Sequence, residues 1–286
     1  MILITDSGST KTNWSIAQNG LSIQSAHTPG INPYFQSQTE IENLIGEILI
    51  PQLSINPKEL KAIYFYGAGC AFDKIEIVKS ALTNYFPIDS IEVNSDLLGA
   101  ARAICGKEAG IACIMGTGSN SCFYDGKQIV KNISPLGFIL GDEGSGAALG
   151  KLLVGDLLKE MLPITLKEKF LSQFNLTPAQ IIENVYRKPF PNRFLASLSP
   201  FIAENIQEPA IYQLALNSFK SFIDRNVKKY DYQNYTTNFV GSIAHYYKEI
   251  LKEAATQTGI QLGNIEQSPI NGLITYHMTE LHNIQN

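Results

Sequence analysis

Near the start of the chain the pattern of hydrophobic and polar residues predicts strands rather than helices. Residues 2–5 form a short apolar, β-branched run, residues 12–17 alternate between apolar and polar, and residues 21–27 form a third expected strand. Asn19-Gly20, between the second and third runs, is typical of a tight hairpin turn. Apolar residues at helical spacing then predict a helix over 37–49.

The next segment alternates between strands and helices. We predict strands at 62–66, 90–94 and 110–115, and helices at 74–86 and 97–105. Three antiparallel strands followed by strand–helix alternation indicate a mixed sheet with helices packed on it.

A second hairpin begins after residue 115 and repeats the plan of the first, including a glycine-rich loop before its first strand. We predict its strands at 121–124 and 128–131. The elements expected after it are helices at 144–161, 166–174, 178–186, 192–205 and 209–229, a strand at 237–240 and a helix at 243–256. This order predicts a duplicated fold.

The length of 286 residues favours two domains over one. We predict an N-terminal domain over residues 1–115 and a C-terminal domain over residues 116–286. The last helix, at about 270–284, is expected to pack back on the N-terminal domain.

The charge balance excludes several classes of partner. Lys and Arg total 22 against 26 Asp and Glu, so a formal net charge of −4 offers no basic surface to a nucleic acid or an anionic membrane. No stretch approaches the roughly 18 unbroken apolar residues of a membrane span, and the first residues lack the pattern of a signal peptide. We expect a cytoplasmic protein with no nucleic acid and no membrane as partner.

The cysteines give no sign of a metal or redox site. Cys70, Cys105, Cys113 and Cys122 form no Cys-x-x-Cys pair and have no histidine at ligand spacing. We therefore predict buried, reduced thiols.

Three predicted strand ends run directly into glycine and hydroxyl residues. These segments are Asp6-Ser7-Gly8-Ser9-Thr10-Lys11-Thr12, Gly116-Thr117-Gly118-Ser119-Asn120 and Val240-Gly241-Ser242. Glycine lets backbone N–H groups approach an anion and hydroxyls add donors, so three such loops favour phosphate binding over ordinary turns. The Walker A and dinucleotide-binding patterns do not fit, because a strand and not a helix follows the first loop.

Two further motifs complete a recognisable set, namely Asn94-Ser95-Asp96 and Gly141-Asp142-Glu143-Gly144-Ser145-Gly146. With the three loops and the Ile243-Ala244 continuation, the chain resembles the BadF/BadG/BcrA/BcrD ATPase family, and within it the N-acetylglucosamine kinases. The resemblance spans residues 6 to 244. It implies an α/β fold of two actin-like ATPase (ribonuclease H-like) domains, each a mixed five-stranded sheet flanked by helices, with a cleft between them.

The resemblance also implies that ATP and Mg²⁺ are the cofactors. It assigns Ser7, Gly8, Ser9, Thr10, Lys11 and Thr12 to the first phosphate loop, Gly116, Thr117 and Gly118 to the second, and Gly241 and Ser242 to the adenosine side. Asp6 would hold Mg²⁺ through water. Lys11 is equally consistent with an exposed surface lysine. Phosphoryl transfer needs mainly positioning and charge neutralisation, which such loops and a metal supply.

Asp96 resembles the aspartate that takes the proton from the attacking sugar hydroxyl, and a plain helix N-cap is its alternative. The sugar-binding residues that the resemblance implies are Asn32, Asp96, Ser119, Asn120, Gly137, Phe138 and Asp142. The sugar would then bridge the two domains. Phe138 is equally consistent with a core residue, and Asp142 with an acidic helix N-terminus.

The expected function is phosphorylation of the 6-hydroxyl of an amino sugar, N-acetylglucosamine first and N-acetylmuramate next. The alternative is an ATPase activator of a 2-hydroxyacyl-CoA dehydratase, whose cluster-ligating cysteines lie at a dimer interface, but Cys105, Cys113 and Cys122 are too evenly spread along a helix and two strands for such a set. A sugar-sensing repressor would need a DNA-binding extension, for which the position of Asp6 leaves no room. The expected partner is a small-molecule amino sugar, with a homodimer left open.

Overall fold

The computed structural model describes residues 1–285, with side chains described up to residue 279. Contacts within the chain group its residues into two units. The first unit contains residues 1–109, 124–129 and 268 onward, and the second contains residues 110–123 and 130–267. The strand at 110–115, which the predicted boundary placed in the N-terminal domain, therefore groups with the second unit, because it pairs with a strand of that unit's sheet.

The first unit holds a five-stranded sheet in the order β3-β2-β1-β4-β5. Its strands are β1 (Ile2–Ser7), β2 (Lys11–Gln18), β3 (Leu21–Pro29), β4 (Ala62–Gly67) and β5 (Ile91–Ser95). Strand β2 is antiparallel to β1 and β3, whereas β4 is parallel to β1 and β5. The predicted mixed sheet is confirmed, and each strand extends to within two residues of its expected range.

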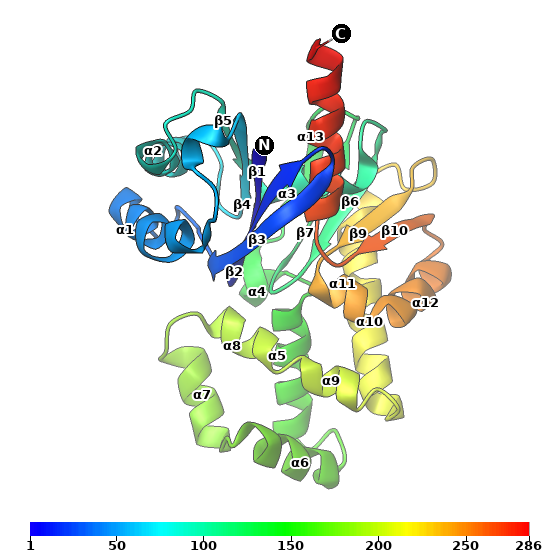
Figure 1. Ribbon diagram of the computed structural model, residues 1–286. Helices are drawn as coiled ribbons and strands as arrows, with labels where there is room; N and C mark the ends of the chain where they lie inside the picture. The colour runs from blue at the N-terminus through cyan, green and yellow to red at the C-terminus, as the bar shows by residue number, and fades with distance from the viewer. Residues whose placement is uncertain (286) are drawn as a thin grey trace. The chain divides into compact units, whose positions relative to one another are not determined.

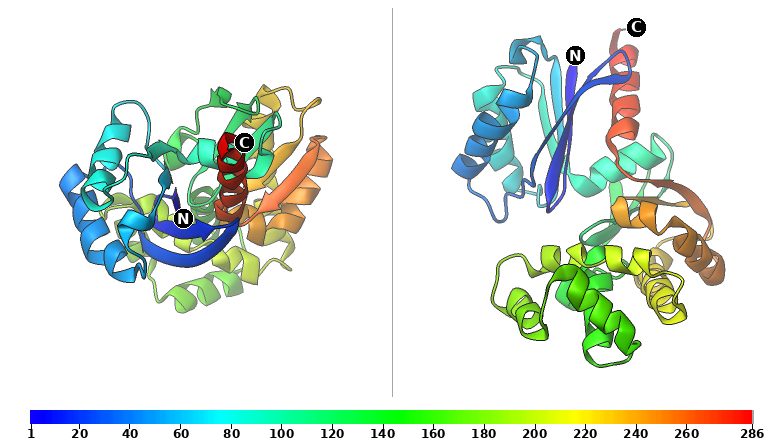
Figure 2. Two further views of the ribbon diagram at one scale, coloured as in Figure 1. Left: turned by 45° about the horizontal axis from the view of Figure 1, so that its top comes forward. Right: turned by 60° about the horizontal axis from the view of Figure 1, so that its bottom comes forward.

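Helices cover both faces of this sheet (Figure 2). The helical elements of the unit are α1 (Gln38–Leu44), the π-helical turn Ile45–Leu49, the 3-10 turns Ile50–Gln52 and Pro57–Glu59, α2 (Lys74–Tyr85), α3 (Asp96–Cys105) and α13 (Ile270–Gln285). Helices α1 and α2 pack on one face, and α3 and α13 pack on the other. The C-terminal helix groups with the first unit.

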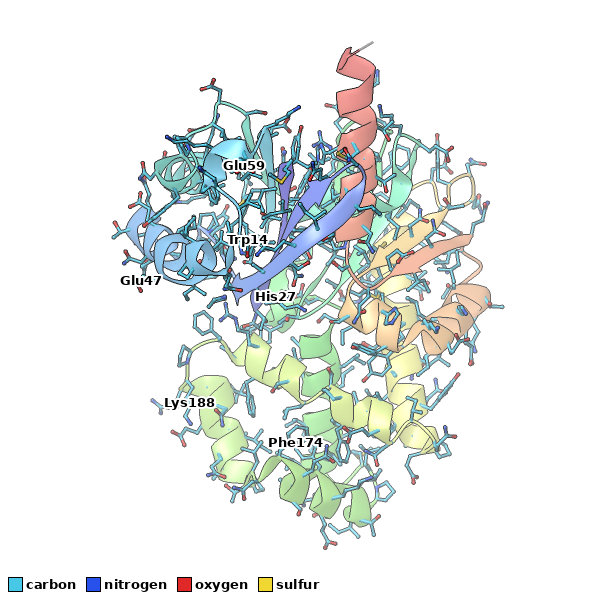
Figure 3. All side chains as sticks on the ribbon, viewed as in Figure 1. Trp14, His27, Glu47, Glu59, Phe174 and Lys188 are labelled. Atoms are coloured by element: carbon cyan, nitrogen blue, oxygen red, sulfur yellow. The ribbon has the colours of Figure 1, made fainter. Side chains whose placement is uncertain are left out.

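The two faces are built from alternate residues of each strand, as the pleat of a strand requires. Leu3 and Trp14 (labelled in Figure 3) belong to the core under α1 and α2. The centroid of the Trp14 ring lies 5.8 Å from that of the Phe65 ring. Ile4 and Tyr66 belong to the core under α3 and α13. Burial of these large side chains is the main favourable term for this unit.

The second unit repeats the plan of the first. Its strands are β6 (Gly110–Met115), β7 (Ser119–Tyr124), β8 (Ile129–Ile133), β9 (Thr237–Val240) and β10 (Leu262–Glu266). Their order β10-β9-β6-β7-β8, taken from its far end, is the order of the first sheet. The predicted duplication is confirmed at the level of topology.

Strand β10 was not predicted from the sequence. Gly263 and Asn264 interrupt its apolar pattern, and its register with β9 shifts between Leu262 and Ile265. The Asn238 side chain accepts a hydrogen bond from the Asn264 N–H at 2.9 Å and replaces part of the regular ladder. A bulged strand of this kind gives no clean period of two.

Helices make up most of the second unit. They are α4 (Gly137–Leu140), α5 (Gly146–Leu158), α6 (Ile164–Phe174), α7 (Pro178–Tyr186), α8 (Pro191–Ser197), α9 (Pro200–Glu204), α10 (Pro209–Arg225), the 3-10 turn Val227–Lys229, α11 (Ser242–Tyr246) and α12 (Lys248–Thr258). Helices α6 to α9 gather around α5 and α10 (Figure 1). Their apolar faces share one core with β6 and β9.

Two of the predicted helices are wrong as single elements. The helix expected at 192–205 is divided into α8 and α9, because Pro200 has no N–H to continue α8 and instead occupies the first turn of α9. The helix expected at 243–256 is divided at Tyr247, whose buried hydroxyl donates to the Ser199 carbonyl at 2.6 Å. No helix in the described part of the chain is long and apolar enough to cross a membrane.

Candidate functional site

Two aspartates of the first unit lie within electrostatic reach of each other where strands β1 and β5 end. Asp6 is the next-to-last residue of β1, and Asp96 follows β5 directly. Burial and, second, the nearby Asp96 carboxylate together raise the pKa of Asp6 to about 6, against the opposing effects of Asn13 and Lys11. Asp6 and Asp96 are called the carboxylate pair below.

Asp96 is the first residue of α3, but it is not the cap of that helix. Ser95 is the N-cap, and its hydroxyl accepts a hydrogen bond from the Leu98 N–H at 3.2 Å. Asp96 Oδ1 accepts from the Leu97 N–H at 2.9 Å. Burial raises the pKa of Asp96 to about 6, so the group is ionised at neutral pH and can still accept a proton. The capping alternative is wrong, because Ser95 fills that role.

The carboxylate pair fits a magnesium ion better than it fits a metal held by protein groups alone. No cluster of three or more His, Cys, Asp and Glu side chains suited to a metal occurs among the described residues. Mg²⁺ commonly uses one or two carboxylates and takes its other ligands from water and phosphate. A divalent cation near Asp6 would also relieve the repulsion within the pair.

The β1–β2 turn is shaped by the side chains of its two flanking residues. The Ser7 and Thr12 hydroxyls are buried, lie 2.7 Å apart and both accept from the Ile31 N–H. These hydroxyls are thus engaged inside the protein and shape the loop. A Cβ atom on Gly30 would come 2.4 Å from the Gly8 carbonyl oxygen, so only glycine fits beside this turn.

The tip of the turn is more accessible than its base. The Gly8 N–H donates to the Lys11 carbonyl at 3.0 Å and closes the turn. Gly8 and Ser9 are half-buried, whereas Thr10 and Lys11 are exposed. Lys11 is thus a surface residue, as its alternative interpretation stated, and its charge still lowers the pKa of Asp6.

Asn32 lies beside the loop that follows β4. Its side-chain oxygen accepts from the Tyr34 N–H at 3.0 Å, and a Cβ atom on Gly69 would come 2.2 Å from that oxygen. Gly69 also has φ +77°, which disfavours other residues. The next residue, Cys70, is buried, and both burial and the Asp96 charge raise its pKa to about 12. The Asn32 oxygen and the Asp96 carboxylate therefore flank one loop.

Gly69 and Cys70 were not among the predicted site residues. The available signal was the glycine-rich turn directly after a buried strand, which repeats the pattern of the three phosphate loops.

In the second unit, backbone hydrogen bonds join the loop after β6 to the loop before α5. The Gly146 N–H donates to the Gly116 carbonyl at 2.9 Å, and the Ala147 N–H donates to the Thr117 carbonyl at 3.0 Å. A Cβ atom on Gly118 would come 3.1 Å from the Asp142 carboxylate. The sequence-predicted residues Gly116, Thr117, Gly118 and Asp142 are therefore neighbours.

Asp142 is held in an unusual conformation beside Ser119. Its φ is +55°, and its carboxylate accepts from the Ser119 N–H at 3.4 Å. Burial raises the pKa of Asp142 to about 6, with Glu143 adding to the rise and the Ser119 N–H opposing it. The helix that follows begins at Gly146 and is capped by Ser145, so Asp142 does not cap it.

The segment around Asp142 has supports that sequence reasoning missed. Glu143 pairs with Arg225 at 3.1 Å, and its carbonyl accepts from the Ser119 hydroxyl at 2.8 Å. The Gly144 N–H donates to the Ser218 hydroxyl at 3.2 Å. Arg225 and Ser218 belong to α10, more than 70 residues away in sequence, so no local pattern could have indicated them.

Gly241 joins the same group of loops in the second unit. Its φ is +129°, and a Cβ atom on it would come 2.2 Å from the Met115 carbonyl oxygen. The ends of β6 and β9 are therefore in direct contact at this glycine. Ser242 follows as the first residue of α11 and is exposed.

Three predicted sugar-binding residues lie at the edge of this group. Asn120 Oδ1 accepts from the Ser121 N–H and from Asn132 Nδ2, both at 2.9 Å. Gly137 is exposed with φ +71°, and Phe138 is half-buried with its carbonyl bound by Lys151 at 2.7 Å. A pocket of about 300 Å³ adjoins the segment, lined among others by Leu136, Gly141, Glu143 and Arg225.

The chain is similar along its whole length to solved structures of one class. It is 51% identical to a candidate N-acetylglucosamine kinase from Porphyromonas gingivalis, covering 98% of this chain and 100% of that one with a TM-score of 0.97. A candidate N-acetylglucosamine kinase from Chromobacterium violaceum is 17% identical, with coverage of 96% and 98% and a TM-score of 0.73.

More distant structures share the fold alone. An MreB protein of Spiroplasma citri, solved with AMPPNP, is 10% identical over 100% of this chain and 98% of that one, with a TM-score of 0.58. The predicted fold of two actin-like ATPase domains is thereby confirmed. No family model and no curated protein matches the sequence.

Proposed function

Because the chain belongs to the N-acetylglucosamine kinase-like family of ATP-dependent sugar kinases, we propose that it phosphorylates the 6-hydroxyl of an amino sugar. N-acetylglucosamine is the first candidate acceptor and N-acetylmuramate the second. The observation that supports this proposal best is the carboxylate pair, in which Asp96 has a pKa of about 6 where a strand passes into a helix.

In the proposed reaction Asp96 accepts the proton of the sugar 6-hydroxyl. The hydroxyl oxygen forms a bond to the γ-phosphorus of ATP while the bond to the β–γ bridging oxygen breaks and ADP leaves. The hydrogen bond from the Leu97 N–H to Oδ1 orients the carboxylate and leaves Oδ2 for the substrate. A base with a pKa near 6 is largely ionised at pH 7 yet remains basic enough to accept a proton.

We propose that the glycine loops hold the nucleotide. Gly8, Ser9, Thr10 and Lys11 in the first unit would meet phosphate oxygens with backbone N–H groups and one cation, while Ser7 and Thr12 keep the loop in shape. In the second unit Gly116, Thr117 and Gly118 would do the same, with Gly241 and Ser242 toward the adenosine. Mg²⁺ bound near Asp6 supplies charge neutralisation for the transferring phosphoryl group.

Sugar recognition is assigned to polar groups at the edges of these loops. Among the described residues, the Asp142 carboxylate accepts a hydrogen bond from the Ser119 N–H alone, at a long 3.4 Å, so it retains capacity for sugar hydroxyls. Asn32, Asn120 and the Gly137-Phe138 segment are the further proposed contacts, with Ser119 contributing through its position beside Asp142. The choice between the two candidate acceptors depends on which of these residues contact the sugar substituents at C2 and C3.

The dehydratase-activator alternative is less favoured. A cluster shared across a dimer interface needs cysteines at the surface, but Cys70, Cys113 and Cys122 are buried and Cys105 is half-buried. Two of these thiols, Cys113 and Cys122, lie within the second sheet.

An ADP-release assay over a panel of amino sugars and hexoses tests the proposal. We expect sugar-dependent ADP release that is largest with N-acetylglucosamine or N-acetylmuramate and small when no sugar is added. Equal ADP release with and without every sugar would contradict it and would favour an ATPase with another partner.

A single substitution tests the role of the base. Asp96→Asn should lower turnover at least about a hundredfold while sugar affinity stays nearly unchanged, because the amide cannot accept the proton. Asp89→Asn makes the same chemical change at an exposed residue of the same unit and should leave turnover unaltered. Wild-type turnover in Asp96→Asn would reject the assignment.

A further inference from the structure

A buried polar cluster lies under α3 and is not used by the proposed chemistry. The Tyr66 hydroxyl, on β4, accepts from Arg102 Nη1 at 2.8 Å and lies 2.8 Å from His277 Nε2. Tyr66 and His277 are almost completely buried, and the His277 ring stacks on Tyr64 with centroids 3.5 Å apart. Burial lowers the pKa of His277 to about 3, so this histidine is neutral.

Helix α3 is pressed directly onto the Tyr66 ring. A Cβ atom on Gly99 would come 2.7 Å from Tyr66 Cγ, so the absence of a side chain at Gly99 sets the distance between helix and sheet. Arg102, one turn further along α3, binds the hydroxyl of the same tyrosine and approaches Glu92 at 3.9 Å. The tyrosine thus contacts α3 through its ring and through its hydroxyl.

The residue at the start of α3 is Asp96. Gly99 is three positions and Arg102 six positions after it, so the two contacts with Tyr66 fix the helix within its first two turns. Tyr66 is also in register with Asp6 on β1 and with Asn94 on β5. The tyrosine therefore lies on the strand between β1, which carries Asp6, and β5, which leads directly into Asp96.

We propose that Tyr66 is a positioning residue for Asp96, with Gly99, Arg102 and His277 as its partners; this inference rests on the proposed function, in which Asp96 is the base. The Tyr66 hydroxyl holds Arg102, and Arg102 holds α3 at the depth and rotation that aim the Asp96 carboxylate. His277 fixes the hydroxyl from the side of α13. Loss of the hydroxyl leaves the ring and the fold in place but allows α3 to shift.

Tyr66→Phe is the first test, read as kcat and KM separately. A misplacement of a reacting group by about 1 Å costs on the order of a hundredfold, so a partial shift of α3 should lower kcat about tenfold. The KM values for ATP and for the sugar should stay within about twofold, because Tyr66 is fully buried and offers no surface to either substrate. Tyr247→Phe is the matched control, since it removes another buried hydroxyl, bound to the Ser199 carbonyl at 2.6 Å, and should leave kcat unchanged.

Gly99→Ala tests the same inference at the contact between α3 and the Tyr66 ring. The added methyl group should displace α3 and lower kcat, again without a matching change in KM. Gly155→Ala is its control, because this helical glycine has open space around the position of a Cβ atom.

The double variant Tyr66→Phe with Asp96→Asn separates positioning from other effects. If Tyr66 acts through Asp96, adding Tyr66→Phe to Asp96→Asn should cause no loss of kcat beyond that of Asp96→Asn alone. A further tenfold loss, or unchanged kcat in Tyr66→Phe, would overturn the inference while the kinase proposal stands. Full turnover in Asp96→Asn would instead overturn the proposed base, and the inference with it.

Discussion

Replacing the proposed catalytic base should make the protein more stable. Burial raises the pKa of Asp96 from its ordinary value of 3.8 to about 6, so the folded protein holds a proton there more tightly than the unfolded chain does. At neutral pH both states are ionised, and the folded state bears the cost of keeping a charge in a poorly solvated place. Asn has nearly the same shape and no charge, and it can keep the hydrogen bond from the Leu97 N–H.

The size and the pH window of this effect follow from the pKa values. A difference of about two pKa units corresponds to about 3 kcal/mol, an upper bound because Asp96 is only half-buried. Because the pKa is raised in the folded state, protonated Asp96 contributes favourably to the free energy of unfolding. This contribution is complete below about pH 4 and is lost as the pH rises through 6. The advantage of Asp96→Asn should therefore grow between about pH 4 and pH 6 and then stay constant.

Thermal unfolding of the wild type and of Asp96→Asn between pH 5 and pH 8 measures this directly. We expect the melting temperature of the variant to exceed that of the wild type by on the order of 6 °C at pH 7.5, and by less at pH 5. Asp89→Asn should show no such pH-dependent gain, because this aspartate is exposed. A melting temperature for Asp96→Asn at or below that of the wild type across this range would refute the reasoning.

Three further predictions concern the pH profile and the glycines. The plot of kcat/KM against pH should fall on the acid side with an apparent pKa near 6 that belongs to the carboxylate pair, and a flat profile down to pH 5 would contradict this. Gly118→Ala should raise the KM for sugar on the order of tenfold by displacing Asp142, measured by steady-state kinetics, whereas Gly155→Ala, at a glycine outside the proposed site with open space for a methyl group, should not. Gly241→Ala should lower the unfolding free energy by about 3 kcal/mol or more, because φ is +129° and the methyl group would meet the Met115 carbonyl, and an unchanged denaturation midpoint would contradict it.

The sequence predicted the strands well where a short run of mostly buried residues ends at a turn. Residues 12–17 and 62–66 fall inside the observed strands β2 and β4, which flank β1 on its two sides. Strand β10 escaped because Gly263 and Asn264 break its alternation and a bulge with Asn238 completes its pairing. A bulge depends on a partner strand, and the local sequence does not contain that partner.

The candidate site was predicted in its residue types and less well in their roles. Glycine and aspartate at strand ends have a local signature, so Asp96 and the glycine loops could be found without coordinates. The engagement of the Ser7 hydroxyl by Ile31 joins residues 24 positions apart, and the pair of Glu143 with Arg225 spans more still. Such partners are set by tertiary packing and become visible only in the folded chain.

The boundary between the units shows the same limit. Residue 115 ends a strand and begins a glycine loop, which made it a natural boundary in the sequence. The strand Gly110–Met115 nevertheless belongs with β9, because the two pair in parallel and share one core. The order of elements along the sequence does not indicate which of the two sheets contains a strand that precedes such a loop.

Asp96 is proposed to activate a sugar hydroxyl for attack on ATP. A ³¹P–¹H correlation spectrum of the product formed from ATP and N-acetylglucosamine by the wild type and by Asp96→Asn tests this role. We expect a phosphorus nucleus coupled to the two C6 protons with the wild type and almost no sugar phosphate with the variant. Phosphate coupled to another sugar position, inorganic phosphate as the only product, or equal product from Asp96→Asn would contradict it.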